Sequence, residues 1–184
     1  MKRILVIGPG GSGKSTLSRK LGEILGLEVI HLDRFYWSAG WVEMPKDKWA
    51  ATIDELLSHE SWIMDGNYSG TLAKRIPASD TIIFLDMPTL LCLWRITKRR
   101  LMHRKQNRPD VAEGCKEKFN PEFYLWVSNY SRRSRPKVLR LIYEQCTTQK
   151  VVYLRSPREV NKFLSAVQKT VNIKRAYSCQ SPVS

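Results

Sequence analysis

The feature that most constrains this chain is one segment that fits the pattern G-x-x-x-x-G-K-[ST] at every position: Gly8-Pro9-Gly10-Gly11-Ser12-Gly13-Lys14-Ser15. An apolar run at residues 4–7 precedes it, and a helical apolar pattern at residues 14–25 follows it. In this strand–loop–helix context the pattern is typical of a phosphate-binding loop. Glycines let the backbone curl so that successive N–H groups point at phosphate oxygens, and the positive end of the helix dipole adds to the attraction.

This loop predicts the nucleotide contacts of the chain. We expect Lys14 to reach the β- and γ-phosphates of ATP and the Ser15 hydroxyl to bind Mg²⁺. The predicted nucleotide-binding residues of this region are Gly8, Gly10, Gly11, Ser12, Gly13, Lys14, Ser15 and Thr16. The alternative is an ordinary glycine-rich turn between a strand and a helix, which the complete match disfavours.

Short apolar runs alternate with helical patterns along the chain, which predicts an α/β fold with a five-stranded parallel sheet and helices on both faces. The predicted strands are residues 4–7, 28–32, 61–64, 81–85 and 151–154. The predicted helices are residues 14–25, 46–59, 89–103, 121–132, 137–146 and 157–171. We expect a single domain over residues 1–171 and a flexible tail over residues 172–184, where the apolar periodicity is lost.

The charge balance is strongly basic, with 31 Lys and Arg against 17 Asp and Glu and a net charge of +14. Much of the excess lies in residues 95–108 and 132–140. Such a density of basic residues indicates a polyanionic partner, either bound phosphate groups or a nucleic-acid backbone, and a solvated basic face is the third interpretation.

The four cysteines form no C-x-x-C pair, which suits reduced thiols. No apolar run approaches the roughly 20 residues of a membrane span. We therefore expect a cytoplasmic protein without a zinc site or a membrane contact.

Two aspartates follow predicted strands at the edge where ligands bind in open α/β sheets. Asp33 is expected to close the second strand and Asp65 the third, so that both face the phosphate loop. Carboxylates in these places can orient an acceptor hydroxyl or hold waters around Mg²⁺, and the alternative for each is capping of a following helix or turn. The histidines stand alone in the sequence, and we assign no catalytic role to His31, His59 or His103.

Several segments resemble the adenylate-kinase-like P-loop kinases. Residues 61–66 are similar to the adenylate kinase stretch that ends in D-G-F-P-R, residues 85–88 to the strand end that follows it, and residues 94–100 to the D-R-I-V-G-R-R segment at the base of the lid. Over nearly the whole chain, HLDRFYW, GW, WIMDGNY, LDMP, LWRITKRR and NRPDVAEGC resemble the bacterial DNA topology modulation proteins (FlaR-like), which are regarded as adenylate-kinase-related kinases. This resemblance implies a P-loop NTPase fold with a small lid at about residues 100–135 and an acceptor flap at about residues 34–60.

The resemblance also implies roles on the nucleotide side. Arg95 would flank the adenine, Arg99 would contact the phosphates, and Arg108 would close over the γ-phosphate as the lid arginine. Arg155 and Pro157, after the last strand, would contact the base. Such roles suit phosphoryl transfer, which depends on in-line positioning and on cations where negative charge spreads.

On the acceptor side, the resemblance implies that Asp65 holds a magnesium-bound water and that Asp33 faces the acceptor. Adenylate kinases follow D-G-F-P with an arginine that grips the acceptor phosphate, whereas Ser69 occupies that place here. Arg34 and Arg75 are nearby alternatives outside the family pattern. A nucleotide, a nucleoside and a small polyol therefore all stay open as acceptors.

Aromatic residues are dense between residues 35 and 49, namely Phe35, Tyr36, Trp37, Trp41 and Trp49. We interpret them as the core of the acceptor flap, with one or two rings shared with the ligand. The predicted acceptor-binding residues are Asp33, Arg34, Trp37, Asp65, Asn67 and Tyr68. The predicted catalytic residues are Lys14, Arg99, Arg108 and Asp33, and the predicted metal contacts are Ser15 and, through water, Asp65.

The leading hypothesis is a kinase that transfers the γ-phosphoryl group of ATP-Mg to a small-molecule acceptor. The rival is a nucleic-acid-binding ATPase affecting DNA topology, which the net charge of +14 favours. The sequence carries no helix-turn-helix, RRM, zinc-finger or OB signature, and most of the densest basic run coincides with the expected lid base. A nucleotide-binding module without turnover is a third possibility, which the intact Lys14, Ser15 and Asp65 disfavour.

Overall fold

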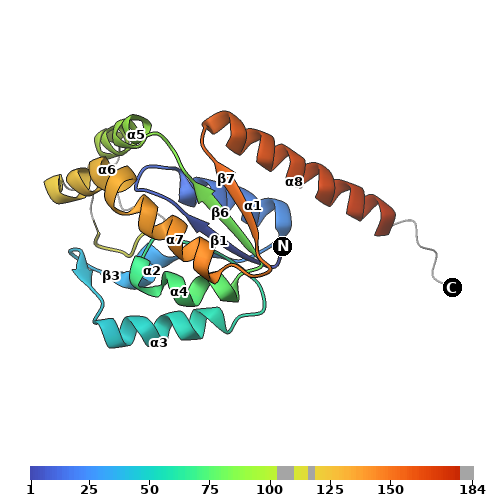
Figure 1. Cartoon of the computed structure of the whole chain (residues 1–184), viewed down its shortest axis with the longest axis horizontal. Helices are drawn as coiled ribbons and strands as arrows, with labels where there is room; N and C mark the ends of the chain where they lie inside the picture. The colour runs from blue at the N-terminus through green and yellow to red at the C-terminus, as the bar shows by residue number, and fades with distance from the viewer. Residues whose placement is uncertain (103–109, 116–118, 179–184) are drawn as a thin grey trace.

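A five-stranded parallel sheet forms the centre of the molecule, with the strand order β2-β5-β1-β6-β7 (Figure 1). The computed structural model describes residues 1–102, 110–115 and 119–178. The strands of this sheet are β1 (Arg3–Ile7), β2 (Val29–His31), β5 (Trp62–Asp65), β6 (Thr81–Leu85) and β7 (Lys150–Leu154). The predicted α/β class and parallel sheet are confirmed.

Helices cover both faces of the sheet, as predicted. They are α1 (Lys14–Leu25), α2 (Leu32–Tyr36), α3 (Lys46–Leu57), α4 (Ser69–Ala78), α5 (Thr89–Met102), α6 (Pro121–Arg133), α7 (Arg135–Gln145) and α8 (Pro157–Ser178). Because strand side chains alternate, Leu5 and Ile7 of β1 pack with α3, α4 and α7, whereas Ile4 and Val6 pack with α1, α5 and α8. The two hydrophobic layers hold β1 rigidly, and the phosphate loop follows directly from its end.

The strand register brings several strand ends to one edge of the sheet. Val6 of β1 lies opposite Asp65 of β5, and His31 of β2 lies opposite the same aspartate on the other side. The carboxyl ends of three neighbouring strands therefore meet beside the phosphate loop, which is the edge where ligands bind in such sheets.

The sequence patterns missed two helices and a two-stranded hairpin. Helix α2 is a single turn, and α4 has only Leu72 and Ile76 as fully buried apolar residues, with Pro77 inside its last turn. A two-stranded hairpin, β3 (Trp37–Ser38) with β4 (Val42–Glu43), forms within the predicted flap. Elements this short carry too few apolar positions for a period to be recognised.

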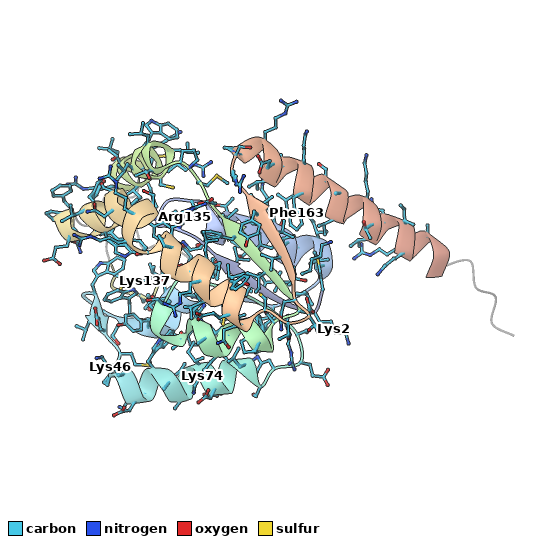
Figure 2. The ribbon with its side chains drawn as sticks, in the orientation of Figure 1. Lys2, Lys46, Lys74, Arg135, Lys137 and Phe163 are labelled. Atoms are coloured by element: carbon cyan, nitrogen blue, oxygen red, sulfur yellow. The ribbon has the colours of Figure 1, made fainter. Side chains whose placement is uncertain are left out.

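Helix α8 corrects the predicted helix end at residue 171, because it continues to Ser178. No glycine or proline interrupts residues 172–178, so no stop signal ends the helix there. Phe163 packs against the body of the protein, while the C-terminal turns of α8 project away from the sheet (Figures 1 and 2). None of the described helices combines the length and the hydropathy that a membrane span requires.

Candidate active site

The phosphate loop leaves β1 at Gly8 and enters α1 at Lys14. Gly11 has a φ of 76°, and a Cβ atom at this position would clash with the Cys92 carbonyl oxygen of α5. Gly13 caps α1 with a φ of 98°. Only glycine adopts these angles without strain, so the motif glycines let the loop curl tightly against α5.

Lys14 is folded back into the loop that precedes it. Its Nζ donates hydrogen bonds to the carbonyl oxygens of Gly8 at 3.0 Å and Pro9 at 2.9 Å. Burial lowers the pKa of Lys14, while the nearby carboxylates of Asp65 and Asp33 act in the opposite direction. The ammonium group of the loop is therefore electrostatically coupled to both predicted acceptor-side carboxylates.

The lowered pKa of Lys14 predicts a pH dependence of nucleotide binding. Phosphate oxygens require the ammonium form, and Lys14 loses its proton at a lower pH than the ordinary lysine value of 10.5. We expect the Kd for MgATP to be level near neutral pH and to rise by up to about tenfold per pH unit in the alkaline range. Titration calorimetry between neutral pH and pH 10 checks this, and the same slope in Lys14→Ala would contradict it.

Two side chains complete the surroundings of the loop backbone. Arg95 of α5 donates from Nη1 to the Ser12 carbonyl oxygen at 2.9 Å. The Ser12 hydroxyl is buried and has no hydrogen-bond partner within the described part of the chain. A buried hydroxyl without a partner is costly, and a bound phosphate group would supply one. Arg95 thus stiffens the loop, in addition to its expected place beside adenine.

Asp65 ends β5 and forms a buried pair with His31, which ends β2. Asp65 Oδ2 lies 2.8 Å from His31 Nδ1, and the two residues are 4% and 6% exposed. Because an ionised carboxylate only accepts hydrogen bonds, the proton of this pair lies on Nδ1. The sequence interpretation left His31 without a role; its place near the end of a predicted strand was the available signal, whereas its position opposite Asp65 is set by the sheet register.

His31 positions the Asp65 carboxylate, and its removal should slow turnover. We expect His31→Leu to lower kcat by about 10- to 100-fold, as loss of a partner behind a metal-facing group does, with a smaller change in KM for ATP. His31→Asn, which keeps a donor, should recover part of the rate. The control is His59→Leu, since His59 is an exposed histidine near Glu28. Equal kcat values for His31→Leu and His59→Leu would refute the positioning role.

Asp33 corrects one prediction, because it does not close a strand. Strand β2 ends at His31, and Asp33 lies in the one-turn helix α2. The reason is that β2 is an edge strand with only one neighbour, so its pairing stops where β5 stops. Asp33 still reaches the same edge of the sheet, where it accepts a hydrogen bond of 2.6 Å from the Tyr68 hydroxyl. Burial and this carboxylate raise the pKa of Tyr68, so the phenol stays protonated.

Arg75 was predicted as one alternative residue that could bind an acceptor phosphate, and the structure gives it another role. The side chain is fully buried in α4. Its guanidinium donates to the carbonyl oxygens of Gly66, Asn67 and Tyr68 at 2.9, 2.9 and 2.8 Å. Burial lowers the pKa of Arg75 to about 9, so it remains charged near neutral pH. Arg75 therefore holds the turn that follows Asp65.

The segment predicted as the acceptor flap contains a run of aromatic rings in contact with one another. The Tyr36 ring centroid lies 5.0 Å from those of Trp37 and Trp49 and 4.6 Å from that of Tyr68. Trp49 is buried, whereas Trp37 is only partly buried. The rings thus form a small aromatic cluster next to the Asp33–Tyr68 pair, while Arg34, also predicted to bind the acceptor, is exposed on α2.

The hairpin of the predicted flap also contacts residues 110–115, which lie within the predicted lid. The Gly40 N–H donates to the Gly114 carbonyl oxygen at 3.2 Å, and Cys115 Sγ lies 3.2 Å from the Ser38 carbonyl oxygen. A Cβ atom on Gly114 would lie 2.8 Å from Ala39 Cβ. The hairpin tip and residues 110–115 are therefore packed together.

Of the residues predicted to contact the nucleotide beyond the phosphate loop, the described part of the chain brings only some close to the loop. Arg99 lies close enough to Lys14 for its charge to lower the pKa of that lysine. Arg155 is exposed, with Nε 3.9 Å from Asp86 Oδ2, and Pro157 begins α8. Arg108 lies outside the described residues. Thr16, in the first turn of α1, has an exposed side chain.

Asp86, which follows β6, has a stronger partner than Arg155. Arg135, at the start of α7, donates from Nε and Nη2 to the two carboxylate oxygens of Asp86, each at 2.8 Å. Figure 2 shows Arg135 where α6 and α7 meet. The bidentate pair fixes this junction to the end of β6.

The donor set suits Mg²⁺ that arrives with a nucleotide. Within the described ranges, no three acidic, histidine or cysteine side chains gather into a metal cage. Kinases hold Mg²⁺ through one or two protein oxygens together with phosphate and water oxygens. A hydroxyl in the first turn of α1 (Ser15) and a carboxylate at the end of β5 (Asp65) fit this requirement.

Comparison with known proteins finds kinases of small molecules. The chain is 32% identical over 108 residues to a shikimate kinase of Halorhodospira halophila, covering 50% of this chain and 61% of that enzyme. It is 24% identical over 161 residues to a shikimate kinase of Vibrio parahaemolyticus, covering 78% and 93%. No protein-family model matches the sequence.

Solved structures define the class of fold. A shikimate kinase from Acinetobacter baumannii in complex with shikimate matches with a TM-score of 0.56 and 16% identity, covering 95% of this chain and 94% of that one. A deoxyadenosine kinase from M. mycoides with bound dATP matches with a TM-score of 0.51 and 14% identity, covering 92% and 98%. The chain therefore has the fold of the small P-loop kinases, like that of shikimate and nucleoside kinases.

Proposed function

We propose that this chain is a kinase that transfers the γ-phosphoryl group of ATP to a hydroxyl group of a small molecule. The observation that carries the proposal is the geometry of one sheet edge: the phosphate loop with Lys14 follows β1, Asp65 ends the neighbouring β5, and Asp33 lies in α2 directly after β2. A phosphate-binding loop thus lies beside groups that can orient an acceptor hydroxyl. The similarity to shikimate kinases supports the same reaction class.

In the proposed reaction, the acceptor oxygen attacks the γ-phosphorus, the bond from phosphorus to the β–γ bridging oxygen breaks, and ADP leaves with the electron pair. Asp33 accepts the proton of the attacking hydroxyl. Lys14 and the loop N–H groups stabilise the charge on the phosphate oxygens, and Arg99 adds a second cation. Ser15 directly and Asp65 through water would hold Mg²⁺, which supplies charge neutralisation between the β- and γ-phosphates.

Further roles belong to the same proposal. Arg95, Arg155 and Pro157 would flank the base, and Arg108 would act as the lid arginine. Residues 34–60 would serve as the acceptor flap and residues 100–135 as the lid of a single domain spanning residues 1–171. The relatives and structural neighbours named above are kinases. Membership in the narrower DNA topology modulation (FlaR-like) family is part of this proposal, and the sequence motifs support it. A cytoplasmic location is supported by the free thiols of Cys92, Cys115 and Cys146.

The fold also bears on the rival nucleic-acid-binding ATPase. Several cations of the basic excess have internal partners: Arg75 holds backbone carbonyls, Arg95 holds the phosphate loop, and Arg135 holds Asp86. A cation with an internal partner contributes less to a surface that attracts a phosphate backbone. This favours the kinase.

A coupled assay of ADP release with a panel of hydroxyl-bearing acceptors tests the proposed function. We expect MgATP binding by calorimetry and an acceptor-stimulated release of ADP. Hydrolysis that is stimulated by DNA, falls steeply with salt and responds to no acceptor would favour the nucleic-acid-binding ATPase instead.

A further inference from the structure

We propose that Tyr130 of α6 and Asn67 of the turn after β5 together bind a hydroxyl group of the acceptor, separate from the hydroxyl that is phosphorylated. This inference rests on the proposed kinase function and deepens it. It adds Tyr130 as a residue that determines specificity, and it names the substrate class as compounds with at least two hydroxyl groups. Two observations carry it: the placement of α6 on the phosphate loop, and two buried polar atoms that face each other without partners.

Helix α6 lies directly against the phosphate loop. A Cβ atom on Gly10 would clash with the Phe123 ring and press on Val127, so the inner face of α6 covers the loop that follows β1. Further along this face, the Trp126 ring stacks with Phe123 at 5.9 Å between centroids, and it meets the Tyr130 ring edge-on at 5.5 Å. One helix face therefore leads from the phosphate loop to Tyr130, because residues three, four and seven apart share a face.

The hydroxyl group of Tyr130 lies above the end of β1. Burial and the carboxylate of Asp86, which follows β6, raise the pKa of this phenol, whereas the side chain of Asn67, two residues beyond β5, acts in the opposite direction. Strands β5 and β6 are the two neighbours of β1. A group that residues beyond both of these strands can reach lies over the strand between them, where the phosphate loop begins.

The side chains of Tyr130 and Asn67 both carry a buried atom that is left unpaired. Tyr130 is 3% exposed, and its Oη has no hydrogen-bond partner within the described ranges; the same holds for Asn67 Oδ1. Arg75 fixes the Asn67 carbonyl oxygen, so the turn is held in place while the side-chain amide stays available. Buried polar atoms without partners are costly, and a ligand that pairs with them recovers this cost. Asn67 itself is only partly buried, so the pair adjoins the surface.

A hydroxyl group is the ligand that satisfies both atoms at once. The protonated phenol of Tyr130 donates a hydrogen bond, and Asn67 Oδ1 accepts one. A hydroxyl group accepts from the first and donates to the second. A carboxylate or phosphate oxygen accepts from Tyr130 but has no proton to donate to Asn67 Oδ1.

This hydroxyl is distinct from the one that attacks the phosphate. The proposed base, Asp33, lies directly after β2, and β5 separates β2 from β1. Because neighbouring strands are about 4.8 Å apart, the ends of β2 and β1 are about 10 Å apart. A single hydroxyl group does not bridge that distance between Asp33 and Tyr130. The acceptor therefore carries at least two hydroxyl groups, as polyols, sugars and nucleosides do.

Pairs of acceptors that differ by one hydroxyl group test the inference. The probes are adenosine with 2′-deoxyadenosine, ribose with 2-deoxyribose, and glycerol with 1,2-propanediol. In at least one pair, we expect the parent protein to give a kcat/KM about tenfold higher for the probe with the additional hydroxyl. Tyr130→Phe removes only the phenolic hydroxyl, and the preference should fall below about threefold in this variant, while the Kd for MgATP stays within about twofold.

Tyr143→Phe is the matched control, because it removes the same group from a side chain of α7 that is 88% exposed. This variant should keep the parental preference. The inference is overturned if the parent shows no preference in any pair, or if the preference survives in Tyr130→Phe. It is also overturned if Tyr130→Phe weakens MgATP binding alone, since the hydroxyl would then serve the nucleotide. Failure of MgATP to bind, or phosphorylation of none of the probes, would refute the proposed function itself, and the inference would fall with it.

Thermal unfolding separates acceptor binding from a structural role of Tyr130. In the absence of ligands, we expect Tyr130→Phe to melt no more than about 2 °C below the parent, because its hydroxyl has no partner in the described part of the free protein. A melting temperature lowered by more than about 4 °C would show that the hydroxyl stabilises the fold, and it would contradict the inference.

Discussion

Replacing Lys14 with alanine is expected to lower kcat/KM for MgATP by about 10³-fold, the largest loss of activity for a single substitution in this chain. The ammonium group is placed by the loop itself, through its hydrogen bonds to Gly8 and Pro9. Alanine removes the cation without a replacement, so the negative charge on the transferred group loses its nearest partner. Steady-state kinetics with the best acceptor measures the effect.

The matched control is Lys20→Ala, which removes the same charge from an exposed position of the same helix. We expect Lys20→Ala to retain kcat/KM within about threefold, because a distant surface charge is screened by salt. The free energy of unfolding of Lys14→Ala should stay within about 1–2 kcal/mol of the parent, since a partly buried ammonium with a lowered pKa is not a strong source of stability. If Lys14→Ala kept more than a tenth of the parental kcat/KM, the assignment of the phosphate loop would be wrong.

Replacing Arg75 with methionine is expected to give the largest loss of stability, about 3–5 kcal/mol of unfolding free energy. Methionine fills part of the volume but donates no hydrogen bond. The carbonyl oxygens of Gly66, Asn67 and Tyr68 would then be buried without their donor. Urea denaturation followed by tryptophan fluorescence and circular dichroism measures the change.

The neighbouring Lys74→Met variant is the control for Arg75→Met. Lys74 pairs with Asp54 at 2.8 Å on the surface between α4 and α3, and its side chain is 54% exposed (Figure 2). We expect this variant to lose less than about 1 kcal/mol, as exposed ion pairs do. Similar losses for Arg75→Met and Lys74→Met would show that the buried guanidinium does not support the turn.

The positions of the phosphate loop and of Asp65 could be predicted because each lies at the end of a strand, whereas Asp33 lies beyond the end of β2, in helix α2. The apolar run of β1 and the glycine pattern are local signals, and Asp65 directly ends a strand that the sequence reveals. The partners of these groups could not be predicted, because they come from segments far away in the chain. Residues 31 and 65 carry no mutual signal in sequence, yet parallel pairing of β2 with β5 places them side by side.

Arg75 illustrates the same limit for charged side chains. In the sequence it is one of many basic residues, and nothing local distinguishes it from Lys74 beside it. Helix α4 directs Arg75 into the protein and Lys74 to the surface, because neighbouring residues of a helix point in different directions. Whether a cation is available to a ligand is therefore decided by packing.

The sequence by itself determined the α/β class, the phosphate loop and the nucleotide that this loop suits, because these features depend on short-range periodicity and on glycine geometry. The tertiary structure decided which side chains meet: His31 with Asp65, Tyr68 with Asp33, Arg75 with the turn after β5, and Arg135 with Asp86. The physical reason is that these contacts span 7 to 49 residues of chain and depend on sheet register and helix packing. Those contacts also decide which charges remain for a ligand.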